Sequence, residues 1–351
     1  MGAIFLDPRM NQQLSIGMKD HHQHGIVIDE IQGLIKVYKD GQVERPPIMP
    51  NVAPTVVAQE LIDLSCKDVV VDKFNNIWAR FYVPRSSSHG NNNKLPLLIY
   101  FHGGGFCVGS AAWICYHEFL AKLASTAGCV IMSVNYRLAP ENRLPAAYDD
   151  GVNALMWVKQ QALNGSNNDQ KCWLNRCNLS KVFIAGDSAG ANIAHNVAKR
   201  AGSGSMGLNP LTLKGIILIQ PFFGGEERTN SEKVLVQPPK SALSLKVSDE
   251  YWRLSLPVGA NRDHKWCNPL AKTATKLEGL KIPPIMVCIS EMDILKDRNL
   301  EFCSAMRRAG KNVEQVMYMG VGHAFQILHN YQLSQTRTHE MMSHIKGFIN
   351  R

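Results

Sequence analysis

Apolar residues recur along the chain in two patterns, and each pattern predicts a different element. The segment LPLLIYF at residues 95–101 is continuously apolar, as in a strand that is buried on both faces. Apolar residues at helical spacing predict helices at residues 116–127, 145–162, 189–201, 296–309 and 332–349. Further strand-like segments lie before and between these helices, at residues 68–72, 77–83, 129–135, 182–185, 213–220, 284–290 and 314–318.

The alternation of strands and helices predicts an α/β fold built on a mostly parallel, doubly wound sheet. Ligands of such sheets bind beyond the carboxyl ends of the strands. Side chains that perform chemistry are therefore expected in the loops that follow the strands. Residues 222–268 are less regular and carry Tyr251, Trp252 and Trp266, which predicts an insertion that caps the sheet.

The N-terminal part of the chain has a different pattern. Residues 1 to about 28 are polar, and we predict a mobile arm there. Residues 31–46 predict a β-hairpin, because Lys39-Asp40-Gly41 separates two β-rich segments and Asp-Gly is a strong turn signal.

Composition and charge narrow the possible functions. The net charge is +9, but Lys and Arg are scattered without a run of five like charges, so we do not expect nucleic-acid binding. The nine cysteines lack the spacing of a metal site and predict free thiols in a reducing compartment. Neither a signal-peptide pattern nor an apolar run of spanning length occurs. We therefore expect no membrane association, and the cytosol as the compartment, with the nucleus as an alternative.

The segment Gly186-Asp187-Ser188-Ala189-Gly190 carries the strongest chemical signal. It follows the apolar strand KVFIA and precedes a helix, which is the context of a nucleophile elbow. Gly is expected on both sides of the turn, since a side chain there would collide with the neighbouring strand or helix. The turn places Ser188 at the positive end of the helix, where developing negative charge is stabilised. We therefore predict that Ser188 is a nucleophile, with Asp187 as part of its motif.

A serine nucleophile needs a base, which follows it late in the chain in the order Ser, Asp or Glu, His. His323 in GVGHAF fits, because it lies between a predicted strand and the last helix. The acid is expected after the preceding strand, where Asp293 ends PPIMVCISEMD. Glu291 and Asp297 are the alternatives for the acid. The pair Asp149-Asp150 is interpreted as a solvated or helix-capping face.

The glycine-rich segment His102-Gly103-Gly104-Gly105 follows the buried strand at residues 95–101. Backbone N–H groups of such a loop can approach a substrate oxygen closely. We predict an oxyanion hole formed by the N–H groups of Gly103, Gly104 and Ala189. A phosphate-binding loop is not favoured, because neither GK[ST] nor GxGxxG follows.

Six segments together resemble plant carboxylesterases of the hormone-sensitive-lipase-like group, which are related to the gibberellin receptors. The resemblance runs from about Gly33 to the C-terminus. Gibberellin receptors lack the catalytic histidine that is present here as His323, which favours an enzyme over a receptor. The family usually reads GDSAGGN, whereas this chain has Ala191 in place of the last Gly. The segments are GLIKVYKDGQVER, YFHGGGFCVGS, VNYRLAPENRLPAAYDDG, GDSAGANIAH, PFFGGEER to NPL, and GVGHAF.

The resemblance implies an α/β-hydrolase core with an eight-stranded sheet. It implies an N-terminal arm and lid at residues 1–50, followed by a catalytic domain at residues 51–351. The family's nucleophile, acid and base fall on Ser188, Asp293 and His323, and its oxyanion motif on residues 102–104. The implied activity is hydrolysis of small-molecule esters through an acyl-enzyme, without a cofactor or metal. A dehydratase, a lactone-forming transesterase and a hormone receptor remain alternatives.

Overall fold

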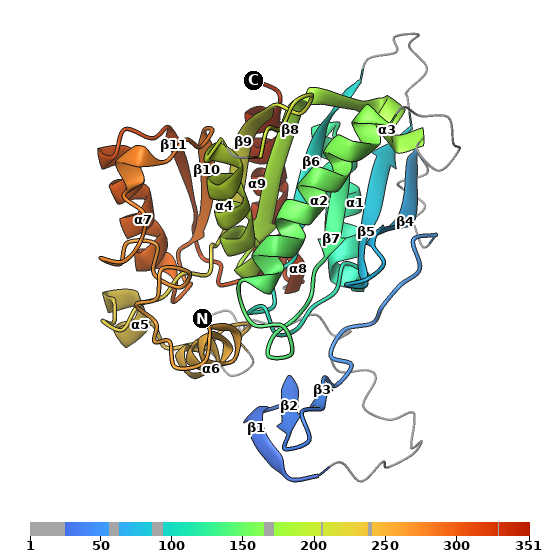
Figure 1. The fold of residues 1–351 in the computed structure, drawn as a ribbon. Helices are drawn as coiled ribbons and strands as arrows, with labels where there is room; N and C mark the ends of the chain where they lie inside the picture. Colours follow the sequence, from blue (N-terminus) through green and yellow to red (C-terminus); the bar gives the residue numbers. More distant parts are fainter. Residues whose placement is uncertain are drawn as a thin grey trace.

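The structure is a computed structural model, and it describes residues 25–55, 63–85, 94–164, 172–204, 206–237, 241–328 and 330–351. Its centre is an eight-stranded sheet with the order β11-β10-β9-β8-β6-β7-β5-β4 (Figure 1). The strands are β4 (Leu64–Asp72), β5 (Ile77–Pro84), β6 (Leu95–Phe101), β7 (Val130–Asn135), β8 (Cys177–Asp187), β9 (Leu213–Ile219), β10 (Ile285–Ser290) and β11 (Val313–Tyr318).

Most neighbouring strands of this sheet are parallel. The pairs from β11 through β10, β9, β8 and β6 to β7 are all parallel, whereas β5 runs antiparallel to both β7 and β4. The predicted sheet is therefore confirmed, and each predicted strand lies within an observed one or overlaps it.

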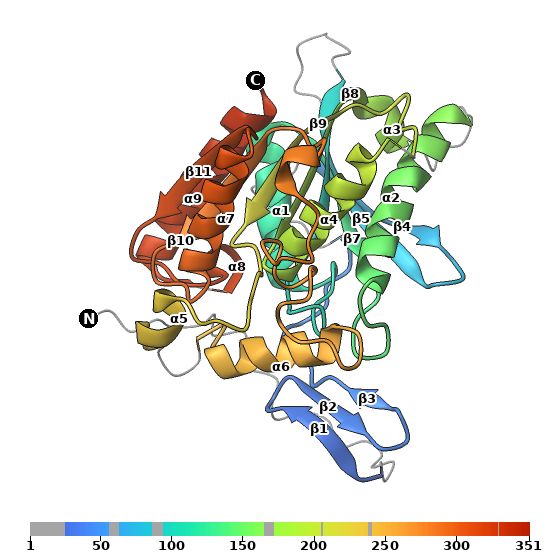
Figure 2. The ribbon, with the colours of Figure 1, turned by 60° about the vertical axis from the view of Figure 1, so that its left-hand side comes forward.

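Helices cover both faces of the sheet (Figures 1 and 2). Leu97, Ile99 and Phe101 of β6 pack into one core layer, while Leu98 and Tyr100 pack into the other. Because side chains alternate along a strand, a strand between two helical layers must be apolar at every position. One face carries α2 (Ala146–Leu163), α4 (Ala189–Gly202) and α7 (Lys296–Arg308), and the other α1 (Ile114–Ala127) and α9 (Gln332–Ile349).

The less regular segment at residues 222–268 covers the carboxyl edge of the sheet, as predicted, but it contains two helices that the pattern did not predict. These are α5 (Asn230–Val234) and α6 (Leu245–Ser255), and Figure 2 shows α6 against this edge. Aromatic stacking holds it there, since the rings of Phe222 and Trp252 lie 4.5 Å apart and nearly parallel. Three other short helices are α3 (Cys172–Arg176), the 3-10 helix η4 (Leu277–Gly279) and α8 (Phe325–Leu328).

The N-terminal part of the structure is a small three-stranded sheet below α6 (Figure 2). The predicted hairpin around Lys39-Asp40-Gly41 is the pair β2 (Ile35–Tyr38) and β3 (Val43–Glu44). The prediction missed β1 (Val27–Ile31), which pairs with β2 through a tight turn at Gly33, where φ is +73°. Residues 1–24 of the expected arm lie outside the described residues. Residues 25–50 are called the cover segment below.

The acidic pair at residues 149 and 150 differs from our interpretation. The Asp149 side chain is half-exposed and pairs with Arg200, but the Asp150 side chain is fully buried. Its carboxylate accepts hydrogen bonds from the backbone N–H and the guanidinium of Arg137, the closest at 2.6 Å. Asp150 is therefore a structural ion-pair residue, because a buried carboxylate needs a charged partner.

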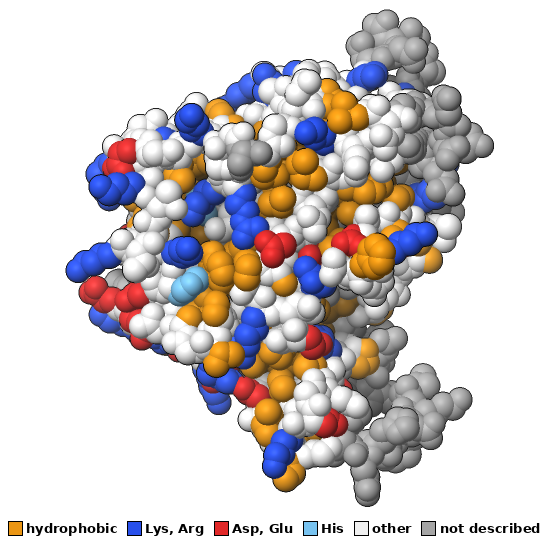
Figure 3. Space-filling view, in the orientation of Figure 1, with side chains coloured by type: hydrophobic (Ala, Val, Ile, Leu, Met, Phe, Trp, Pro, Cys, Tyr) orange, Lys and Arg blue, Asp and Glu red, His pale blue; other side chains and the backbone are white. Residues whose placement is uncertain are grey.

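The structure shows how the charged side chains and the cysteines are distributed. On the face shown in Figure 3, Lys and Arg side chains are spread among acidic and uncharged ones. The eight cysteines whose side chains are described are all free thiols. Within the described ranges, no helix is both long and apolar enough to cross a membrane, and no cluster of metal-ligating side chains occurs.

Candidate active site

Ser188 lies in a sharp turn between β8 and α4, with φ +52° and ψ −119°. This is a strained conformation for a residue other than glycine, and such strain marks functional turns. A Cβ at Gly186 would lie 2.3 Å from the backbone of Gly190, and one at Gly190 would lie 1.9 Å from the carbonyl oxygen of Phe101. The expected reason for glycine on both sides of the serine is therefore confirmed.

The structure brings the predicted base and acid to this serine. His323 Nε2 lies 2.9 Å from Ser188 Oγ, and His323 Nδ1 lies 2.7 Å from Asp293 Oδ2. All three side chains are buried, with exposed fractions of 6% or less. Because a carboxylate only accepts hydrogen bonds, Nδ1 carries the imidazole proton and Nε2 is free to accept the serine proton.

The alternative acids are occupied elsewhere. Glu291 accepts a hydrogen bond from the N–H of Gly320, and Asp297 accepts one from the N–H of Ser231 at the start of α5. Neither carboxylate has a hydrogen bond to His323. The loop after β10 therefore presents only the Asp293 carboxylate to the imidazole.

The glycine-rich loop differs from our prediction at one position. The N–H of Gly103 is already bonded within the protein, because it donates to Tyr116 Oη, 2.7 Å away, and to Asp187 Oδ1, 3.1 Å away. This hydrogen bonding does not support the predicted role of Gly103 as an oxyanion donor. Gly104 and Gly105 line the pocket instead, and neither N–H has an acceptor among the described residues. A side chain on Gly105 would overlap the ring of Tyr251.

Asp187 supports this loop from behind. Its buried carboxylate accepts hydrogen bonds from the hydroxyls of Tyr100 and Tyr116, at 2.8 and 3.0 Å, and from the N–H of Gly103. Burial raises the pKa of Asp187 to about 6, and these donors oppose the rise. The carboxylate thus holds the loop that carries Gly104 and Gly105.

His102 is a structural part of the same loop. Its ring stacks on Tyr136 at 4.3 Å, and its Nδ1 lies 2.8 Å from the carbonyl oxygen of Gly103. Complete burial lowers the pKa of His102 to about 4, so the imidazole is neutral near pH 7. A side chain at Gly109 would collide with this ring.

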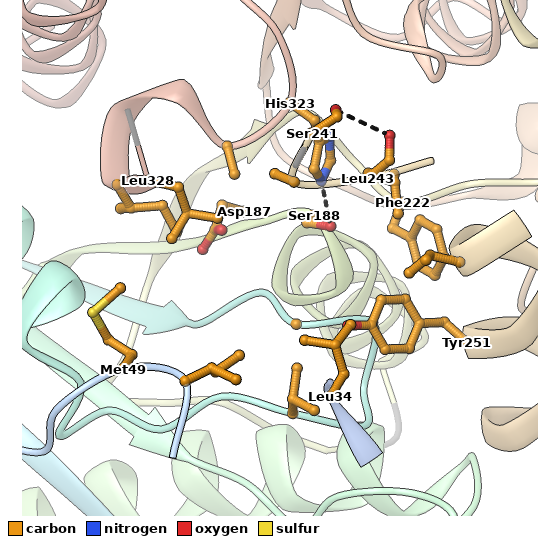
Figure 4. Close-up of a pocket in the computed structure, with 18 of the residues that line it drawn as sticks. Leu34, Met49, Asp187, Ser188, Phe222, Ser241, Leu243, Tyr251, His323 and Leu328 are labelled. Atoms are coloured by element: carbon orange, nitrogen blue, oxygen red, sulfur yellow. Dashed lines mark hydrogen bonds between the residues drawn. The ribbon is translucent and has the colours of Figure 1, made fainter. Parts of the chain in front are cut away.

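A cavity of about 500 Å³ opens above Ser188, and its walls are mostly apolar. In Figure 4, Met49 and Leu328 lie on one side of the serine, and Phe222 and Tyr251 lie on the other. The walls come from the cover segment, from α1 and α8, and from the segment at residues 222–268 that contains α6. No Lys or Arg is among the described residues that line the cavity.

One buried residue near the triad was not found from the sequence. The side chain of Gln220, just after β9, accepts a hydrogen bond from the N–H of Ala324 and donates one to Ser290 Oγ. Gln220 is the last residue of the strand that the sequence predicts at residues 213–220. Its position at the carboxyl end of a parallel strand was the signal that could have found it, because ligand-facing residues gather at that edge.

Comparison with known proteins agrees with this architecture. A model of the α/β-hydrolase fold family matches residues 98–327. Probable carboxylesterase 6 of Arabidopsis thaliana is 49% identical over 93% of this chain and 92% of its own length. The 2-hydroxyisoflavanone dehydratase of Glycine max is 35% identical over 91% of this chain and 97% of its own. An esterase from Pyrobaculum calidifontis superposes with a TM-score of 0.65 and 28% identity, over 81% of this chain and 84% of its own.

The chain therefore belongs to the α/β-hydrolase fold family. Within that family it is a carboxylesterase, of the plant group that the sequence motifs resemble.

Proposed function

We propose that the protein hydrolyses uncharged carboxylic esters through an acyl-enzyme, with Ser188 as nucleophile, His323 as base and Asp293 as the group that orients the base. The observation that carries this proposal is the hydrogen-bonded series Ser188–His323–Asp293 at the base of an apolar cavity. A serine hydroxyl is a weak nucleophile, and a neutral imidazole in this position activates it.

In the first half of the reaction, Ser188 Oγ bonds to the ester carbonyl carbon and its proton passes to His323 Nε2. The carbonyl oxygen becomes an anion, which the N–H groups of Gly104, Gly105 and Ala189 stabilise at the positive end of α4. The bond to the alcohol oxygen then breaks, and that oxygen takes the proton from His323. In the second half, water gives a proton to His323 as its oxygen bonds to the acyl carbon. The bond from that carbon to Ser188 Oγ then breaks, Oγ takes the proton back from His323, and the acid leaves.

The lining of the cavity supports an uncharged substrate. Asp187 and His323 are the acidic and imidazole side chains among the described residues that line the cavity, and no Lys or Arg is among them. A carboxylate on either side of the ester would lose its water without gaining a counter-ion, which is costly. Apolar groups would instead pack against side chains such as Met49, Phe222 and Leu243.

A fluorophosphonate probe tests the proposal directly, because it labels only an activated serine. We expect rapid labelling and ester hydrolysis by the parent protein, and neither by Ser188→Ala. Ser241→Ala is the matched control, since Ser241 lines the same cavity but has its hydroxyl bonded to Gln237 and Leu243. Labelling that persists in Ser188→Ala, or a parent protein that is never labelled, would overturn the proposal.

Product analysis separates hydrolysis from the elimination that the dehydratase relative performs. In H₂¹⁸O, hydrolysis places one heavy oxygen in the released acid and yields the acid and the alcohol in equal amounts. Loss of water from an intact substrate would give neither product. That result would favour a dehydratase that uses the same pocket.

A further inference from the structure

The short segment between β9 and the aromatic Phe222 lies at the meeting point of the three loops that carry the triad. Ser188 N–H donates to the carbonyl oxygen of Ile219 at 2.8 Å, and Phe222 N–H donates to the carbonyl oxygen of Ser188 at 3.0 Å. The backbone of residues 219–222 thus holds the serine on both sides. Gln220 is the residue between these contacts.

The side chain of Gln220 reaches the other two loops. Its Oε1 accepts the N–H of Ala324, the neighbour of His323, at 2.7 Å. Its Nε2 donates at 2.6 Å to the hydroxyl of Ser290, which lies three residues before Asp293. One amide therefore bridges the loop of the base and the loop of the acid.

The orientation of this amide is set by its partners. An N–H group can only donate, so the atom that faces Ala324 must be the oxygen. The nitrogen then faces Ser290 Oγ, which can accept. Complete burial excludes water as a substitute partner, so both hydrogen bonds are needed to satisfy the amide.

The backbone at both ends of this contact has an unusual conformation. Gln220 has φ +47° and Ala324 has φ +57°, and neither residue is a glycine. Such conformations persist only where surrounding contacts hold them. For Ala324 the contact at its N–H comes from Gln220, and the carbonyl side of the same peptide bond belongs to His323.

We propose that Gln220 is a positioning residue that sets the place of His323 relative to Ser188 and Asp293. The expected change in rate rests on the proposed function, but the expected change in the position of His323 does not. Without the amide, the Ala324 turn loses its hydrogen bond and the imidazole shifts from the serine. A misplacement of about 1 Å in a reacting group can cost about 100-fold in rate.

Three variants separate this role from simple packing. Gln220→Met keeps the length of the side chain and removes both hydrogen bonds. Ser290→Ala removes the bond on the acid side alone. Asn299→Leu is the matched control, because the hydrogen bonds of the buried Asn299 go to the carbonyl oxygens of Pro221 and Leu295 and not to a side chain of the triad.

Steady-state kinetics on a neutral ester give the first result. We expect kcat of Gln220→Met to fall about 10- to 100-fold with KM within about threefold, a smaller loss in Ser290→Ala, and Asn299→Leu within about threefold of the parent. Equal kcat for Gln220→Met and Asn299→Leu would overturn the inference. If Gln220→Met does not fold, Ser290→Ala replaces it in the comparison. A kcat of Ser290→Ala equal to that of Asn299→Leu would then overturn the inference.

Crystal structures of the same variants give a result that does not depend on activity. We expect the distance from His323 Nε2 to Ser188 Oγ to exceed 3.5 Å in Gln220→Met and to stay near the parent's 2.9 Å in Asn299→Leu. An unchanged distance in Gln220→Met refutes the positioning role even if no ester is hydrolysed. Absence of labelling in the parent protein would refute the proposed function alone.

Discussion

Two regions enclose the pocket, the carboxyl edge of the large sheet and the cover segment, and they are held in different ways. At the sheet edge, backbone and buried side chains are joined by short hydrogen bonds such as those of Ser188, Asp187 and Gln220. The cover segment packs Ile31 and Ile35 inward and leaves Ile28 61% exposed outside.

Ionic contacts link the rim of the cover segment to the rest of the protein. Asp29 pairs with Arg253 of α6, and Arg45 donates to Glu141 and to the carbonyl oxygens of Cys107 and Ala139. Exposed ion pairs contribute little to stability. The carboxyl edge of the large sheet therefore positions the reacting groups, while the cover segment supplies apolar contact area to the pocket. Changes at the edge should therefore affect kcat, and changes in the cover should affect KM.

The largest expected effect is at the acid. Asp293→Asn keeps the size of the side chain but favours the wrong imidazole tautomer and leaves the imidazolium without its carboxylate. We expect kcat to fall up to about 10⁴-fold. Glu291→Gln and Asp297→Asn should stay within about tenfold of the parent, because their carboxylates bond elsewhere. A crippled Glu291→Gln beside an active Asp293→Asn would contradict this assignment.

A second prediction uses pH to separate the two regions. Burial raises the pKa of Asp187 from 3.8 to about 6, so the folded state disfavours the ionised carboxylate. Its contribution to the free energy of unfolding should therefore decrease as pH rises from about 4 to about 6, by about 3 kcal/mol in all. Urea unfolding of the parent and Asp187→Asn at several pH values measures this difference.

Asp29 in the cover segment is the control, with the opposite sign. Its hydrogen bond to Arg253 lowers the pKa of Asp29 in the folded state. Its contribution to stability is therefore present above the pKa of the unfolded state and is lost as pH falls through the folded pKa. Asp29→Asn should thus differ most from the parent at neutral pH. If the free energy of unfolding changed with pH in the same way for the parent and for Asp187→Asn, the pKa of the buried Asp187 carboxyl group would not be raised.

The third prediction tests the charge of the pocket with two esters of nearly equal length. We expect kcat/KM for p-nitrophenyl butyrate to exceed that for p-nitrophenyl hydrogen succinate by about 100-fold at pH 7.5, since a desolvated carboxylate without a partner is costly. Leu243→Lys, which adds a cation to the lining, should narrow the ratio. Equal rates for the two esters in the parent protein would contradict an uncharged substrate.

The smallest expected effect is in the cover segment. Leu34→Ala and Met49→Ala each remove apolar contact area from the pocket lining, and we expect KM for a long-chain neutral ester to rise about five- to tenfold with kcat nearly unchanged. Ile28→Ala is the control, because Ile28 lies on the exposed side of the same sheet. A fall in kcat with unchanged KM would show that the cover also places reacting groups.

The local sequence pattern was sufficient to predict the helices and strands that are long and strongly apolar. The strand at residues 95–101 and the helix at residues 332–349 have the predicted bounds, because burial on both faces and helical spacing leave a direct record in the sequence. Helices α5 and α6 were missed. Both are short, and α6 is packed through aromatic contacts of Tyr251 and Trp252 with Phe222 that no local pattern records.

The sequence by itself determined the fold class and the order and spacing of Ser188, Asp293 and His323, since strand ends and chemically specific residues can be recognised locally. Only the tertiary structure decided which way each backbone N–H points, and it turned that of Gly103 to Tyr116 and Asp187. It also decided that Gln220 bridges the loops of the base and the acid. Apart from the contact between Gly103 and Tyr116, these contacts join residues 70 or more positions apart, so they arise from packing rather than from any pattern along the chain.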